Sequence, residues 1–139
     1  MTLSRVSAGN GHGTDGAAGD GLSVTIDGAL VCITGHGFWS DAGVDSHFIA
    51  LRRIAAAARL HHPRFKVLVD LRTSAVQTRA IGERIERETR SIWTPADRIA
   101  MVLRPGLAKL QMNRIVDSQN HQTFDRIDLA RKWLDREPD

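Results

Sequence analysis

The sequence predicts an α/β protein with a mixed, mostly parallel sheet and one antiparallel hairpin at the sheet's edge. Three observations predict this class. A two-residue turn, Asp27-Gly28, separates two short apolar stretches, which is typical of a hairpin. Later in the chain, apolar stretches of strand length alternate with amphipathic stretches of helix length. The 139 residues are 42% hydrophobic and 25% charged, which fits one soluble domain.

The N-terminal residues 1–21 predict a flexible tail. They contain "SAGNGHGTDGAAGDG", which is rich in glycine and offers almost nothing to bury, so ordering it would cost more entropy than burial could offset. These glycines do not predict a phosphate-binding loop, because no strand precedes them and no helix follows. We therefore expect one folded domain over residues 22–139.

The domain is expected to open with the hairpin, formed by a strand from residue 22 and a second strand over 30–34. An amphipathic helix should follow over residues 41–61, with Ser40 or Asp41 capping its first turn. Its apolar side chains recur at spacings of three and four: Val44, Phe48, Leu51, Ala55 and Ala58. The run "FKVLVDL", residues 65–71, is apolar almost throughout, which indicates a strand buried on both faces.

The pattern of helix and strand then repeats. A helix over about 76–92 should bury Ile81, Ile85 and Ile92 and pair Glu83 with Arg87 and Glu86 with Arg90 on its outer face. A strand over 98–103 and a helix over 106–118 with Ala108, Met112 and Ile115 in line come next. A short extended piece at 122–124 precedes a last helix, capped by Asp128 and burying Ala130, Trp133 and Leu134. The predicted order is ββαβαβα(β)α.

Right-handed crossovers would bring the loops after the second, third and fourth strands to one edge of the sheet. Open α/β sheets bind ligands at this edge. The side chains expected there are His36, Phe38, Trp39, Arg72, Thr73, Ser74 and Arg104. Two helix N-termini and two arginines would stabilise an anionic ligand or an acidic partner loop. The alternative is that Arg72 and Arg104 are solvated and that local side chains cap both helices.

Phe38 and Trp39 are adjacent, so both cannot point into the core if the segment is extended. One is expected to face outward and to mark a contact surface, because tryptophan is enriched where proteins meet. The alternative is that the loop bends and buries both rings.

Motifs that would indicate an enzyme or a metal site are missing. The chain has no G-x-S-x-G elbow and no H-E-x-x-H pair. Asp70 at the end of a strand is better explained as an acceptor for loop N–H groups than as a catalytic carboxylate. We therefore expect no catalytic residue, no metal ligand and no cofactor.

The charge pattern and the single Cys32 bear on which partners and which cellular compartment to expect. Net charge is +3, and sixteen of the nineteen cationic residues are arginine, but acidic residues interrupt them throughout 83–98, so nucleic-acid binding is not expected. One cysteine allows no internal disulfide and fits a reducing cytoplasm. The chain carries neither a signal-peptide pattern nor eighteen consecutive apolar residues, so we expect a cytoplasmic protein without a membrane span.

The predicted order, Gly35 after the second strand, "VLVDL", "RIAMVL" and the ending "TFDRIDLARKWL" together resemble the STAS-like (SpoIIAA-like) superfamily. This superfamily includes anti-sigma-factor antagonists and domains of anion transporters. The closing segment looks most like small bacterial STAS-like proteins of unknown function, sometimes grouped with lipid-binding SEC14-type domains. The resemblance covers residues 22–135 and implies a STAS-like fold.

The resemblance also implies a phosphorylation site to look for. Anti-sigma-factor antagonists resemble one another in an Asp-Ser-Ser-Gly segment after the third strand, where a serine is phosphorylated. This chain has Thr78, Arg79, Ala80 and Ile81 about there, so the serine pair and the glycine are missing. Thr78, Ser74 or Thr73 could accept a phosphate in their place.

Together these observations predict a non-enzymatic binding or regulatory module that acts through protein-protein contacts. A carrier or sensor of a small lipophilic or anionic ligand is the first alternative, and a phospho-switched anti-sigma-factor antagonist is the second. The sequence also allows a homodimer.

Overall fold

The computed structural model describes residues 3–9, 21–106 and 120–136 of the chain, with backbone alone for 3–9. The described strands form a six-stranded sheet in the order β1-β2-β3-β4-β5-β6. Strands β1, β2 and β3 pair antiparallel, and β3 to β6 pair parallel. The strands are β1 (Leu3–Gly9), β2 (Gly21–Asp27), β3 (Leu30–Gly37), β4 (Lys66–Ser74), β5 (Arg98–Val102) and β6 (His121–Phe124). The α/β class and the mixed sheet are as predicted.

Strand β1 corrects the prediction of a flexible tail over residues 1–21. Residues 3–9 pair with β2 along its whole length, from Leu3 opposite Asp27 to Gly9 opposite Gly21. The hairpin β2–β3 therefore lies inside the sheet rather than at its edge. Sequence patterning missed β1 because a strand at an edge draws its hydrogen bonds from the neighbouring backbone and needs few apolar side chains of its own. Residues 10–20 lie outside the described part of the chain.

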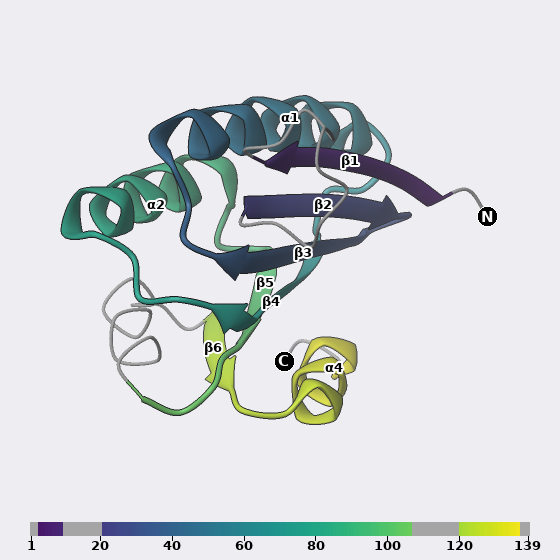
Figure 1. Ribbon diagram of the computed structural model, residues 1–139. Coiled ribbons are helices and arrows are strands. Elements are labelled where there is room, and N and C mark those ends of the chain that lie inside the picture. The colour runs from purple at the N-terminus through teal and green to yellow at the C-terminus, as the bar shows by residue number, and fades with distance from the viewer. Residues whose placement is uncertain (1–2, 10–20, 107–119, 137–139) are drawn as a thin grey trace.

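Helices cover both faces of the sheet, as Figure 1 shows. Helices α1 (Asp41–Arg59) and α2 (Arg79–Ile92) lie on one face, and α4 (Ile127–Asp135) lies on the other. Val67, Val69 and Leu71 of β4 pack toward α1 and α2, whereas Leu68 packs toward α4. The prediction that this strand is buried on both faces is therefore confirmed.

Several local predictions can be checked against the helices. Ser40 caps α1, since its hydroxyl accepts a hydrogen bond from the Gly43 N–H (3.0 Å). Asp128 does not cap α4: the N-cap is Arg126, and Asp128 lies in the first turn, where it forms an ion pair with Arg126 (2.7 Å). The prediction failed because the helix begins at Ile127, one residue before Asp128, so Asp128 is already a helical residue.

On the outer face of α2, one of the two predicted ion pairs forms. Arg90 contacts Glu86 (2.8 Å), as expected. Glu83 instead pairs with Arg79 (3.1 Å), which also lies four residues away but on the N-terminal side. The predicted helix over 106–118 lies outside the described residues, apart from its first residue.

Candidate functional site

The loops after β3, β4 and β5 meet at one edge, which we call the carboxyl edge. The parallel register sets Gly37 of β3 beside Ser74 of β4, and Asp70 of β4 beside Val102 of β5. The Ala75 N–H donates to the Gly37 carbonyl (3.0 Å), which ties the first two loops together beyond the strands. The predicted gathering of these loops is thus present.

Arg72 is held by its own strand rather than free to bind an anion. Its Nε and Nη2 donate to the two carboxylate oxygens of Asp70 at 2.9 and 2.8 Å, and its backbone N–H donates to the same carboxylate (3.2 Å). These hydrogen bonds hold the pKa of the Asp70 carboxyl below its usual value. Asp70 therefore accepts a backbone N–H, as predicted, but that N–H belongs to β4 itself and not to the loop that follows.

The side chains of Thr73 and His36 also form a hydrogen bond with each other. The Thr73 hydroxyl donates to the Gly35 carbonyl (3.1 Å) and lies 2.6 Å from His36 Nδ1. The Thr73 hydroxyl thus contacts both groups, and the tautomer of His36 decides which atom donates in the Thr73–His36 contact. The polar groups at this part of the edge bond to each other.

Ser74 is only 9% exposed, and its hydroxyl is buried with no hydrogen-bond partner among the described residues. It lies against Gly35, where three neighbouring side chains leave no room for a Cβ. A Cβ at Gly35 would lie 2.7 Å from Leu71, 2.8 Å from Trp39 and 2.9 Å from the Ser74 hydroxyl. Gly35 is needed here because β3, β4 and the Trp39 ring approach closely.

Gln77 fixes the two loops relative to each other and was missed by the sequence analysis. Its side-chain carbonyl accepts from the Trp39 N–H (2.8 Å), and its amide NH2 donates to the carbonyls of Gly37 (2.9 Å) and Ala75 (2.7 Å). The side chain is 5% exposed. No sequence pattern could have identified it, because two of its partners lie 38 and 40 residues away.

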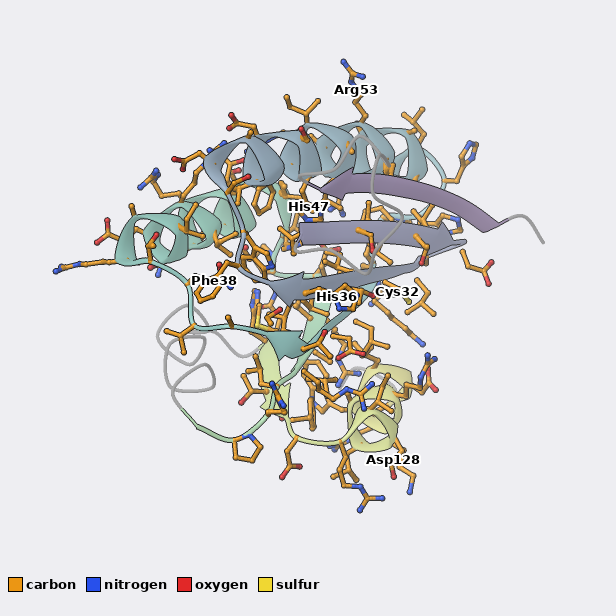
Figure 2. The ribbon with its side chains drawn as sticks, in the orientation of Figure 1. Cys32, His36, Phe38, His47, Arg53 and Asp128 are labelled. Atoms are coloured by element: carbon orange, nitrogen blue, oxygen red, sulfur yellow. The ribbon has the colours of Figure 1, made fainter. Side chains whose placement is uncertain are left out.

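The clamped loops present an apolar surface. Phe38 is 60% exposed and Val76 is 41% exposed, whereas Trp39 is 6% exposed. The prediction that one of the two adjacent aromatic residues faces outward is confirmed, and the outward residue is Phe38. In Figure 2, Phe38 lies at the end of β3, and His47 lies between α1 and the sheet.

Arg104, just after β5, is exposed and has no ion-pair or hydrogen-bond partner among the described residues. The helix N-termini are capped locally: Ser40 accepts from the Gly43 N–H, and Thr78 accepts from the Ile81 N–H (3.3 Å). The alternative of local capping therefore holds for both helices. Little remains at this edge to bind an anion apart from Arg104.

A small cavity of about 40 Å³ lies in the core between the sheet, α1 and α2. It is lined by apolar side chains together with Trp39, His47 and Thr89. His47 is 2% exposed, and burial lowers the pKa of its imidazole to about 4. Its Nδ1 and the Trp39 indole N–H have no hydrogen-bond partner within the described part of the chain.

Within the described ranges, no group of three or more His, Cys, Asp or Glu side chains is arranged to hold a metal ion. None of the described helices combines the length and apolar character that crossing a membrane requires. The chain matches no family model. A search of curated proteins finds no match for it.

Proposed function

We propose that the chain is a non-enzymatic binding module that docks a protein partner through its carboxyl edge. The observation that carries the proposal is Phe38, which is 60% exposed on a loop fixed by the buried Gln77. A large aromatic side chain in water is a typical anchor for a partner. Because its loop is already held in place, little conformational entropy is lost when a partner binds.

The polar groups of the same edge favour this function over anion binding. Arg72 forms an ion pair with Asp70, and His36 and Thr73 bond to each other. What remains for a partner is the apolar pair Phe38 and Val76, with Arg104 at the same edge. A protein surface matches this combination better than a phosphate or a carboxylate does.

The two alternative functions have weaker support. The core cavity of about 40 Å³ is far smaller than the cavity of about 150 Å³ that holds benzene in an engineered protein, so a lipophilic ligand would have to widen it. Of the three candidate phosphate acceptors, Ser74 is buried, whereas Thr73 and Thr78 are exposed. STAS-like membership, a homodimer and cytoplasmic location stay predictions.

Photo-crosslinking tests the proposal. A benzophenone side chain is introduced at position 38 of the full chain in cells that express it naturally, and the same group is placed at position 53 as a control. Arg53 is also exposed but lies on the outer side of α1, as Figure 2 shows. We expect a discrete crosslinked product from position 38 and none from position 53.

Mass spectrometry of the product distinguishes a different protein from a second copy of this chain, and either result supports a contact surface at Phe38. In a chain labelled at position 76, Phe38→Ala should lower the yield several-fold, because the anchor is lost. Failure to crosslink from position 38, or the same products from positions 38 and 53, would refute the proposal.

A further inference from the structure

A second cleft lies at the opposite edge of the sheet, where β4, β5 and β6 begin. We call it the amino-edge cleft. It is open and has a volume of about 1170 Å³. Phe65, Trp93, Trp133 and Leu134 are the large apolar side chains in its walls. Its charged lining residues among those described are Arg64, Lys66, Arg90, Arg98, Arg136 and Asp135.

The charge of this cleft is strongly unbalanced, with five cations against the single carboxylate of Asp135 among its described lining residues. That carboxylate pairs with Lys66 only at 3.4 Å and is 77% exposed. Arg64 and Arg136 are exposed and have no side-chain ion pair or hydrogen bond to another described residue. Glu86, outside the cleft, pairs with Arg90 (2.8 Å), but among the described residues the cations of the cleft still outnumber the carboxylates, so its charge is positive.

The register of the sheet places two of these cations side by side. Lys66 of β4 lies directly opposite Arg98 of β5. Like charges facing each other across two strands destabilise a sheet. The Arg98 guanidinium is set over the Trp133 ring (4.2 Å to the ring centroid) and donates to the Arg136 carbonyl (2.6 Å), so it is held in place. A bound anion would relieve the repulsion between the two cations.

We propose that the amino-edge cleft binds an acidic segment of a partner protein. The cleft is open, whereas pockets that hold a small ligand bury most of its surface. Carboxylates spaced along a chain can reach the separate cations at the ends of β4, β5 and α4 in a way that one small anion cannot.

The aromatic residues of the cleft favour a protein over a single-stranded nucleic acid. Binding of nucleotide bases depends on exposed aromatic faces on which they can stack. Trp93 is 9% exposed, Trp133 is 8% exposed and Phe65 is 1% exposed. The cations are thus accessible, whereas the rings are not.

Fluorescence anisotropy with the full chain tests this inference. The probe is a labelled oligo-glutamate peptide of about ten residues, compared with an oligo-glutamine peptide of the same length. We expect the glutamate peptide alone to bind, and its affinity to fall as salt is raised. Arg64→Glu and Arg136→Glu should each lower the affinity by about 2- to 10-fold, and the double variant should lower it further.

Arg53→Glu is the matched control, because it makes the same change in net charge at an exposed site far from the cleft. Its affinity should stay within about 2-fold of the parent chain. An equal loss in Arg53→Glu would overturn the inference, because net charge alone would then explain binding. If oligo-glutamate does not bind, the inference is also overturned. The same holds if an oligonucleotide of equal charge binds as tightly and depends on the same arginines. Crosslinking from Phe38 tests the other edge, so either proposal can fail without the other.

Discussion

Among single residues, His47 is the buried ionisable side chain with the clearest consequence. It packs edge-on against Phe48 (ring centroids 4.9 Å apart) and lines a cavity that has no charged side chain in its described walls. Burial without a charged partner disfavours the imidazolium, and the pKa is lowered from 6.5 to about 4. His47 is therefore neutral in the folded protein near neutral pH.

This lowered pKa predicts that the folded state loses stability in mild acid. Between pH 6.5 and about 4, the unfolded chain binds a proton at His47 that the folded chain does not. The stabilisation is fully present above pH 6.5 and is lost as the pH falls across this window, by about 3 kcal/mol in total. Denaturant unfolding at a series of pH values measures it.

His47→Leu is the comparison, because Leu cannot titrate. Burial lowers the pKa of His121 as well, so the parent chain and the variant share that contribution, and their difference isolates His47. Parallel stability curves between pH 6.5 and 4 would show that His47 does not have this lowered pKa.

For some single residues, the sequence was not sufficient to predict the environment of the side chain. Adjacency alone indicated that Phe38 and Trp39 differ in exposure, but which one is buried depends on the Trp39 ring packing beside Gly35. The sequence also offered Arg72 as an anion ligand, with a solvated Arg72 as the alternative. Its carboxylate partner, Asp70, is only two residues away, yet the pairing depends on how the strand end turns.

At the scale of elements, one buried side chain reinforces the link between the loops after β3 and β4, which the hydrogen bond from the Ala75 N–H to the Gly37 carbonyl also joins. Gln77 bonds to three backbone groups across both loops. If it is lost, the Trp39 N–H is left buried without its acceptor or must open to water, whereas the Gly37 carbonyl keeps its hydrogen bond from the Ala75 N–H. Each such buried group costs about 1–3 kcal/mol.

Gln77→Leu is therefore expected to lower the free energy of unfolding by about 1–3 kcal/mol and to speed hydrogen exchange at the Trp39 amide. Gln122→Leu, on the exposed side of β6, is the control and should change the stability by less than about 0.5 kcal/mol. Unchanged exchange at Trp39 in Gln77→Leu would contradict the role of Gln77 as a clamp.

Elements with strong patterns were predicted best. The helix α1, the buried strand β4 and the order from β2 to β5 follow from periodicity and turn residues. Strand β1 was missed, because its seven residues gain their partners from β2 and not from a pattern of their own. Helix bounds were right to within three residues, since caps and fraying decide the terminal turns.

In the whole molecule, Asp97 joins three segments distant in the sequence. It is fully buried, and its carboxylate accepts from Arg59 (3.1 and 2.9 Å), the Phe65 N–H (2.8 Å) and the Thr94 N–H (2.8 Å). Burial alone would raise the pKa of the Asp97 carboxyl, but the donors from Arg59, Thr94 and Phe65 hold it below the usual value. The end of α1, the start of β4 and the loop before β5 are thus fastened together.

Asp97→Ala should lower the free energy of unfolding by about 3–5 kcal/mol, because it leaves the Arg59 charge and two N–H groups without their acceptor. Chemical denaturation measures the loss. Asp135→Ala is the control: its carboxylate is 77% exposed, so we expect a loss of at most about 1 kcal/mol. A similar small loss in Asp97→Ala would show that the buried carboxylate does not fasten these segments.

The sequence by itself determined the α/β class, the parallel core strand and the meeting of three loops at one edge, because hydrophobic periodicity and crossover handedness are local or nearly local constraints. Only the tertiary structure decided what that edge offers. Arg72 and Thr73 bond to neighbouring groups of the edge, Gln77 reaches across about 40 residues of sequence, and Phe38 is left exposed. The tertiary structure also placed Lys66 beside Arg98 at the opposite edge. Pairings between distant residues depend on strand register and packing, which sequence patterns do not encode.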